Sequence, residues 1–371
     1  MKKHYQLLLV LLLFAGTVFA LPQVKKQLDV KSGQKLVVDL ECGSDIIIEG
    51  WDKNVVDIDV DIRGRDADDV DVEISETSYG VLIAADFYSN RRNNSTKGEI
   101  TVKVPLKFDL ELETMGGELN VDNVDGNLEG TTMGGSLTLK NLKGEIKFKT
   151  MGGSIDLIDS EVDGEVSTMG GSVLVENVVG DVDASTMGGS VTQKNVKSCK
   201  GSTGKEVKIK SMGGSINVDE AMRGANVTTM GGEINVNKAA EYVKAETMGG
   251  DVTIEEVAGW VDASTMGGDV EVTVVGSDGD RSVKLSSMGG NIRLNVPANL
   301  DMDIEIEIIY DEDDEDDVDI ISDFDLSEKV VDSNRDWGHD TRKLIGTGQT
   351  GSGKNKIKIK TVGGKVYLKK V

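Results

Sequence analysis

The triplet Met-Gly-Gly occurs ten times in the chain, and this repeat constrains the fold more than any other feature. The copies begin at Met115, Met133, Met151, Met169, Met187, Met212, Met230, Met248, Met266 and Met288. Most successive copies follow one another at the same 18-residue interval, and the only longer intervals are those after Met187 and Met266. A short repeat of fixed length indicates one structural unit stacked on copies of itself. The middle of the chain should therefore grow along one axis, and a function must lie on its faces, edges or ends.

Each 18-residue unit divides into two halves with the pattern of a short strand. In the unit that starts at Met133, Leu137 and Leu139 alternate with polar residues, and Ile146 and Phe148 do so nine residues later. Alternation with a period of two indicates a strand with one buried face, and glycine before a strand is typical of a tight corner. We therefore predict an all-β fold, a parallel two-sheet β-solenoid built from 18-residue coils.

A three-sided left-handed helix also has a coil of this length, made of three hexapeptides. Its six-residue phase fails here. Stepping from Met133 reaches Leu139 and then Glu145, which is charged where a buried residue is needed. Parallel strand crossovers are usually right-handed, so we expect a right-handed winding.

The segments outside the repeats suggest an export signal and two caps. Residues 1–20 place Lys2 and Lys3 before the apolar run from Leu7 to Phe14, which is the layout of a cleavable signal peptide. Residues 21–110 are predicted to form an N-terminal β cap, and residues 111–297 the solenoid. Residues 298–346 form an acidic excursion, expected to be loop or short helix. Residues 347–371 are expected to close the stack, with Val362 in place of Met and a lysine-rich edge strand that hinders polymerisation.

The negative net charge of the chain disfavours polyanionic partners. The chain has 41 Lys and Arg residues against 65 Asp and Glu residues, a net charge of −24. Such a chain repels nucleic acid and anionic membranes. No segment after the signal is long and apolar enough to span a bilayer. We expect an exported monomer that is periplasmic, surface-located or extracellular, without a cofactor.

Three further columns of the repeat have structural explanations. Thioethers can bind soft metal ions, but methionine commonly fills gaps, so the Met column favours packing. Thr or Ser precedes every one of these methionines, which indicates hydrogen bonding at the corner. Asn123, Asn141, Asn177 and Asn195, with Asp159 between them, form a second corner column of residues that tolerate tight turns.

Two insertions supply the candidate interaction residues. Both follow the same register position, after Val196 and after Val275, so they should leave the stack at one corner. Insertions on one edge of a solenoid commonly bind partners. The candidates are Lys197, Lys200 and Lys205 in the first insertion and Asp278, Asp280 and Arg281 in the second.

Metal and disulfide sites have weaker support. The acidic run offers Asp311, Asp313, Asp314, Asp316 and Asp317 as weak calcium ligands, but it lacks the glycine-punctuated spacing of a dedicated loop. Cys42 and Cys199 lie about four coils apart or more, so we expect two unpaired thiols.

A polysaccharide-active enzyme and a calcium-responsive β-roll are the alternatives to a binding protein. With 65 acidic residues, pairs such as Asp181 and Asp183 arise by chance. Only His339 remains after signal removal, and the tryptophans, among them Trp260, look isolated, so no aromatic platform for sugars recurs along the coils.

Four features of the sequence belong together: Gly33-Gln-Lys-Leu-Val-Val-Asp-Leu, Gly43-Ser-Asp-Ile-Ile-Ile-Glu-Gly-Trp51-Asp, the serial Thr-Met-Gly-Gly coils and Ile357-Lys-Ile-Lys-Thr-Val-Gly-Gly-Lys-Val-Tyr-Leu. Through them, nearly all of the chain after the signal resembles the bacterial putative-adhesin family of β-strand-repeat proteins, otherwise described as a domain of unknown function. The resemblance implies a β-solenoid in an envelope setting. We therefore expect a non-enzymatic, adhesin-like scaffold or binding protein whose partner is an envelope protein or a glycan.

Overall fold

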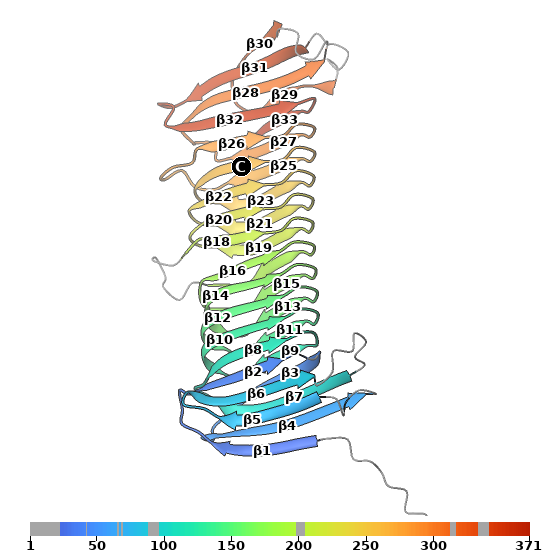
Figure 1. Ribbon diagram of the computed structural model, residues 1–371. Coiled ribbons are helices and arrows are strands. Elements are labelled where there is room, and N and C mark those ends of the chain that lie inside the picture. Colours follow the sequence, from blue (N-terminus) through green and yellow to red (C-terminus); the bar gives the residue numbers. More distant parts are fainter. Residues whose placement is uncertain are drawn as a thin grey trace, which may run out of the picture.

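The computed structural model is an all-β rod (Figure 1). It describes residues 23–41, 43–64, 67, 70–87, 96–197, 205–311, 317–332 and 341–371. The signal segment, Cys42 and Cys199 therefore lie outside the described residues. None of the described residues belongs to a helix that could cross a membrane.

The strands of the repeat region alternate between two parallel sheets, as predicted. Sheet A contains β9 (Leu119–Asp122), β11 (Leu137–Lys140), β13 (Ile155–Ile158), β15 (Val173–Glu176), β17 (Val191–Lys194), β19 (Ile216–Ala221), β21 (Ile234–Ala239), β23 (Val252–Val257), β25 (Val270–Val274) and β27 (Ile292–Val296). Sheet B contains β8 (Asp109–Thr114), β10 (Asp125–Thr132), β12 (Lys143–Thr150), β14 (Glu161–Thr168), β16 (Val182–Thr186), β18 (Val207–Lys210), β20 (Ala225–Thr228), β22 (Tyr242–Glu246), β24 (Trp260–Ser264) and β26 (Val283–Ser286).

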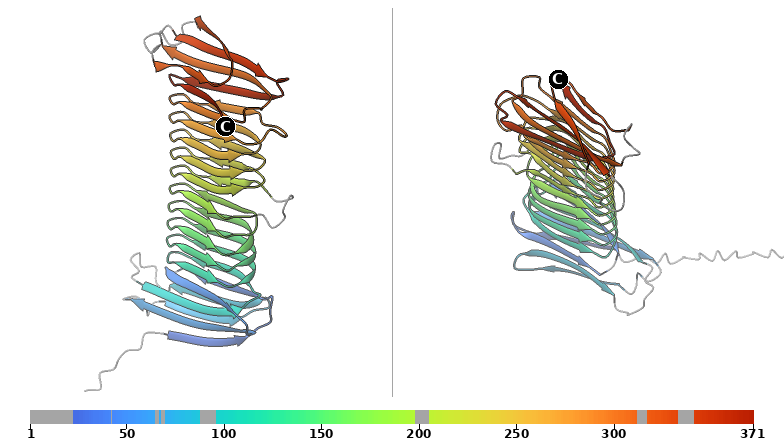
Figure 2. Two further views of the ribbon diagram at one scale, coloured as in Figure 1. Left: turned by 180° about the vertical axis from the view of Figure 1, so that it is seen from behind. Right: turned by 90° about the horizontal axis from the view of Figure 1, so that it is seen from above.

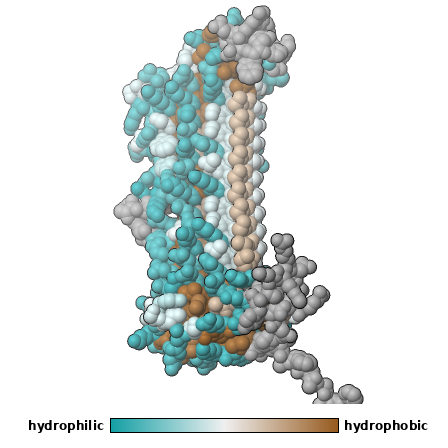
Figure 3. Space-filling model, viewed as in Figure 1, coloured by the Kyte–Doolittle hydropathy of each residue, from teal (hydrophilic) through white to brown (hydrophobic). Residues whose placement is uncertain are grey.

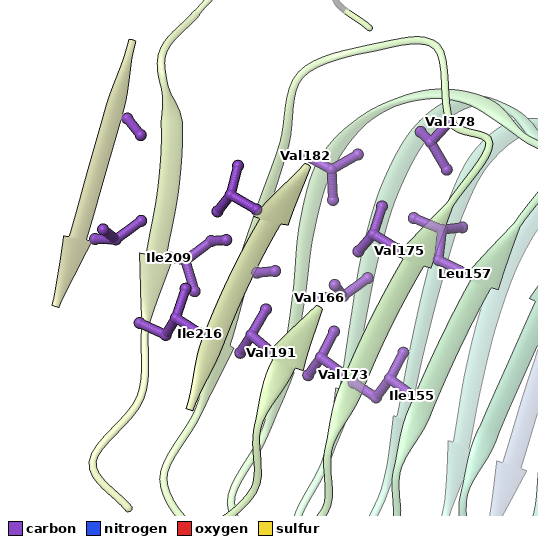
Figure 4. Packing of buried hydrophobic residues seen from close by; sticks show 14 of the residues in the cluster. Ile155, Leu157, Val166, Val173, Val175, Val178, Val182, Val191, Ile209 and Ile216 are labelled. Atoms are coloured by element: carbon purple, nitrogen blue, oxygen red, sulfur yellow. The ribbon is translucent and has the colours of Figure 1, made fainter. Parts of the chain in front are cut away.

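The pairing register confirms the 18-residue coil. Leu137 pairs with Ile155 in sheet A, and Leu128 pairs with Ile146 in sheet B. The two halves are unequal in the early coils, because β11 has four residues and β12 has eight. Inward-facing aliphatic side chains from both sheets meet in a continuous narrow core (Figure 4). Stacking therefore supplies both the backbone hydrogen bonds and the hydrophobic contacts that one coil lacks.

Two kinds of corner join the sheets. One edge of the rod carries a regular column of Met-Gly-Gly turns, and the opposite edge carries connections of varied length, short in most coils and long at the two insertions (Figure 2). At the regular edge, Thr168 is buried, and its hydroxyl donates to the carbonyl of Gly153 at 2.7 Å and accepts from the amide of Gly171 at 3.3 Å. The same bonds recur along the column, so the predicted role of the hydroxyls is confirmed.

The Met column was expected to serve packing, but it does not pack into the core. These ten methionines, called the Met ladder below, are between 46% and 60% exposed. They form a continuous stripe along the rod, pale brown in the space-filling view (Figure 3).

At the opposite corner, the asparagine column adopts the left-handed conformation that its residue types predicted. The φ angles of Asn123, Asn141, Asp159, Asn177 and Asn195 lie between 49° and 61°. Replacing Asn177 (φ 56°) by alanine is expected to cost about 1–2 kcal/mol, since alanine lacks the short polar side chain that lets asparagine adopt this region and the Asn177 bond to Asp159 is lost. Asn177→Gly is the control and should cost less. Urea unfolding midpoints test this order, and a glycine variant as unstable as the alanine variant would contradict it.

An antiparallel cap covers the start of the stack. It contains β1 (Gln23–Asp29), β4 (Val55–Gly64), β5 (Val70–Glu76), β6 (Gly80–Phe87) and β7 (Thr96–Pro105). The coil formed by β2 (Lys35–Leu40) and β3 (Ser44–Trp51) lies between this cap and the repeats. β2 pairs in parallel with β6 and β8, and β3 with β7 and β9.

The other end has the same arrangement and corrects two predictions. Residues 298–346 were expected to include loop or short helix, but their described part consists largely of strands, namely β28 (Met302–Asp311), β29 (Ile320–Ser322), β30 (Ser327–Asp332) and most of β31 (Thr341–Thr350). β32 (Asn355–Val362) and β33 (Val366–Lys370) then return into the stack. β32 lies between β26 and β28, and β33 between β27 and β29.

The lysine-rich strand β32 is therefore an interior strand. Its lysines face glutamates of β28 instead of guarding an edge. Lys358 pairs with Glu305 at 3.5 Å, and Lys360 pairs with Glu307 at 3.1 Å. The acidic excursion and the basic closing strand are thus complementary neighbours.

Candidate functional site at the insertion corner

Both insertions leave the rod at the same corner. The first joins β17 to β18, and the second joins β25 to β26. Each connection runs from sheet A to sheet B, on the edge opposite the Met ladder (Figure 2). The region between the two insertions consists of the coils from β18 to β25.

The predicted interaction residues have different environments. Lys197 and Lys205 are exposed at the two ends of the first insertion, and Asp278 and Asp280 are exposed in the second. Lys200 lies outside the described residues.

Arg281 is buried instead of exposed, which corrects its assignment as a contact residue. Only 8% of its surface is exposed. Its guanidinium donates to the carbonyls of Val275 at 3.1 Å and Asp280 at 3.2 Å. Arg281 therefore holds the second insertion together.

An aromatic pair lies between the two insertions. Tyr242 is the first residue of β22, Trp260 is the first residue of β24, and the two are register partners. Their ring centroids are 4.6 Å apart, and the ring planes differ by 5°. The other face of Tyr242 lies against Gly224, where an added Cβ would come within 2.4 Å of the ring carbons.

The expectation that Trp260 is isolated is therefore wrong. The signal was present in the sequence, because Tyr242 and Trp260 are one 18-residue period apart and so occupy the same outward column. A search for recurring tryptophan alone misses a pair of two different aromatic residues.

A groove adjoins each member of the pair. The Trp260 groove has a volume of about 320 Å³ and includes Asp262, Asp280, Lys284, Lys356 and Lys358. The Tyr242 groove has a volume of about 420 Å³ and includes Asp183, Lys205, Glu206, Lys208, Arg223 and Glu241. Each groove thus combines one aromatic ring with one residue from an insertion, Asp280 or Lys205.

The charges in the grooves are mixed and locally paired. Arg223 forms an ion pair with Glu241, and Lys284 lies 3.4 Å from Asp262. Hydrogen bonds from the side chain and the backbone amide of Ser282 lower the pKa of Asp280 below its ordinary value. At neutral pH the Trp260 groove therefore presents both hydrogen-bond acceptors and donors beside an aromatic ring.

The weak calcium candidates are only partly described. Asp311 and Asp317 are exposed on either side of the acidic run, while Asp313, Asp314 and Asp316 lie outside the described residues. Among the residues that the structure describes, no cluster of three or more His, Cys, Asp or Glu side chains could hold a metal ion.

Comparison with known proteins finds distant likeness only. No family model and no curated protein matches the chain. A "putative cell adhesion protein" from Clostridium sporogenes is 8% identical, with 94% of this chain and 99% of that chain covered and a TM-score of 0.20. A "putative adhesin" from Parabacteroides distasonis is 12% identical, with 74% and 90% covered and a TM-score of 0.30.

A "putative lipid binding protein" from the same organism is 17% identical, with 71% of this chain and 96% of that chain covered and a TM-score of 0.27. These identities and TM-scores are too low to transfer a function.

Proposed function

We propose that the chain is an exported, non-enzymatic binding protein of the adhesin type, which acts as a monomer at the cell envelope and binds a glycan at the insertion corner. The observation that carries this proposal is the stacked Tyr242–Trp260 pair between two insertions, with a groove beside each ring. Lys205 and Asp280 are the contacts that the insertions contribute.

The chemistry of the two grooves favours a glycan over a nucleic acid or a basic peptide. Both faces of Tyr242 are covered, so the face of Trp260 that points away from Tyr242 is the apolar surface for the C–H face of a sugar, and the surrounding polar groups can bind the hydroxyls. Lysine and carboxylate side chains line each groove, and Arg223 is added in the Tyr242 groove, which suits an uncharged ligand that offers many donors and acceptors. The net charge of −24 opposes a polyanion such as nucleic acid.

The lowered pKa of Asp280 does not suit the role of a general acid. Glycoside hydrolysis needs one carboxyl group with a raised pKa as the general acid. The bonds from Ser282 change the pKa of Asp280 in the opposite direction. Asp280 is therefore suited to accept hydrogen bonds from a ligand.

Replacing Trp260 by alanine is expected to weaken glycan binding by at least about tenfold, because aromatic anchors dominate such contacts. The mature chain, residues 21–371, would be assayed against purified peptidoglycan and isolated envelope polysaccharides. Trp51→Ala is the matched control, since Trp51 is also half-buried but lies in β3, away from the insertions. It should bind as the parent protein does.

Three results would overturn the proposal. One is the absence of binding to any of these glycans, and another is equal binding by the Trp260→Ala variant and the parent protein. Release of soluble sugar fragments would instead identify an enzyme.

A further inference from the structure

The Met ladder is unusually uniform for an exposed part of the surface. The eight inner methionines are between 46% and 50% exposed, while Met115 and Met288 at its ends are 54% and 60% exposed. The end residues are more exposed because each lacks a methionine on one side. Each inner side chain is therefore partly covered by its neighbours in the stack, and every rung has nearly the same environment (Figure 3).

Packing explains the neighbouring columns but not the methionines. The second glycine of each triplet is required by space, as at Gly171, where a Cβ would come within 2.3 Å of the preceding coil's backbone. The hydroxyl column is fixed by its hydrogen bonds. A half-exposed aliphatic position would accept leucine, isoleucine or valine equally well, yet all ten repeats have methionine. Two properties distinguish methionine from these residues, its unbranched, flexible chain and its thioether sulfur, and only the sulfur can bind a ligand.

The surroundings of the ladder leave the thioethers accessible and without competing ligands. A groove of about 620 Å³ runs beside five of the methionines, from Met151 to Met230. Its other side consists of outward Thr, Ser and Lys residues of sheet B. The hydroxyls that precede the methionines already donate to glycine carbonyls, for example from Thr168 and Thr186.

We propose that the Met ladder binds soft monovalent metal ions, Cu(I) or Ag(I), between thioethers of consecutive rungs. Zinc–thiolate bonds are about 2.3 Å long, and two metal–sulfur bonds of about this length in line span about 4.6 Å. Adjacent strands of a sheet are about 4.8 Å apart, so neighbouring thioethers are spaced to hold one ion between them. The three rotatable bonds of methionine allow the remaining adjustment.

The donor set selects the class of ion. Thioethers favour Cu(I) and its soft analogues, whereas calcium and magnesium require oxygen ligands. Among the described residues, no cluster of His, Cys, Asp or Glu competes as a metal site. The net charge of −24 attracts cations to the rod in general. Ten thioethers used two at a time give a capacity of about five ions per chain.

Ag(I) is the probe for the test, because it needs no reductant. The protein is the mature chain with Cys42→Ser and Cys199→Ser, so that thiols do not bind the ion. Dialysis against Ag(I) followed by elemental analysis is expected to give about five ions per chain. A variant with all ten ladder residues changed to leucine keeps the apolar column and is expected to bind none of them. Circular dichroism checks that both proteins are folded.

A second measurement uses the unaltered chain and does not depend on the leucine variant. With methyl-labelled methionine, Ag(I) should shift the NMR signals of the ladder methyl groups. Met222 is 55% exposed but stands outside the ladder, and Met302 is fully buried, so both signals should stay in place.

Equal Ag(I) uptake by the leucine variant, or unshifted ladder signals, would overturn the proposal. Equal uptake of Zn(II) or Ca(II) would show that the charge of the rod, and not its sulfur, collects the ions. Because the ladder and the aromatic pair lie on opposite edges, the Trp260→Ala variant should retain full Ag(I) uptake.

Discussion

Replacing Gly268 by alanine is expected to destabilise the rod by roughly 3 kcal/mol or more, whereas Gly267→Ala should cost less than about 1 kcal/mol. A Cβ on Gly268 would lie 2.3 Å from the carbonyl oxygen of Gly250 in the preceding coil. A Cβ on the adjacent Gly267 would lie 3.5 Å from the carbonyl oxygen of Gly249. The clash at Gly268 is with backbone that the stack holds in place, so it cannot be relieved locally. Denaturant midpoints of the two variants measure the difference.

The comparison also tests why the corner contains glycine. Glycine usually serves a turn by adopting positive φ, but neither Gly267 nor Gly268 does so. We attribute the second glycine of each triplet to the close approach of successive coils. Equal losses of stability in the two variants would contradict this explanation.

Removing residues 351–371 is expected to detach the C-terminal cap, formed by β28 to β31, from the stack of coils. This deletion takes away β32 and β33, which separate the stack from β28 and β29. It exposes the open edges of β26 and β27, and unpaired edges of this kind associate with one another. The expected result is end-to-end association, measured by light scattering after size-exclusion chromatography.

Removing residues 21–29 is the matched control. It deletes β1, which pairs only with β4 at the outer side of the other cap among the pairings that the structure describes. That variant should remain monomeric. If the 351–371 deletion also stays monomeric with a native circular dichroism spectrum, β32 and β33 are not needed to close the stack.

The parts of the fold that the sequence predicted are those that the repeat encodes. A strict 18-residue period fixes which residues pair, so the two parallel sheets, the hydroxyl bonds and the left-handed Asn177 column followed directly from it. The ends of the rod carry no such period. The strand order at the ends depends on pairings between segments that are distant in the sequence, such as Glu305 with Lys358. The alternating acidic and basic residues are compatible with this pairing but do not specify it.

The sequence predicted which corner of the rod carries the insertions, but not which side chains are exposed at that corner. Alignment of the two insertions on one register position placed them on one edge. The alignment could not show that the Arg281 guanidinium donates its hydrogen bonds to carbonyls of its own loop, since those bonds depend on the path of the loop. The Tyr242–Trp260 pair and the exposure of the methionines both follow from which side of a strand or corner faces solvent. A column-by-column comparison of chemical type would have found the aromatic pair.

Because all coils are alike, the length of the rod can change without changing the residues of the aromatic grooves. Excising one whole coil, for example 133–150, would join Thr132 to Met151 and leave every column intact. The rod would shorten by about 4.8 Å and lose one methionine, while the aromatic grooves kept all their residues. Duplication of a coil would lengthen the rod by the same increment. The length of the rod and the number of its thioethers can therefore be changed in whole-coil steps, independently of the residues that line the grooves.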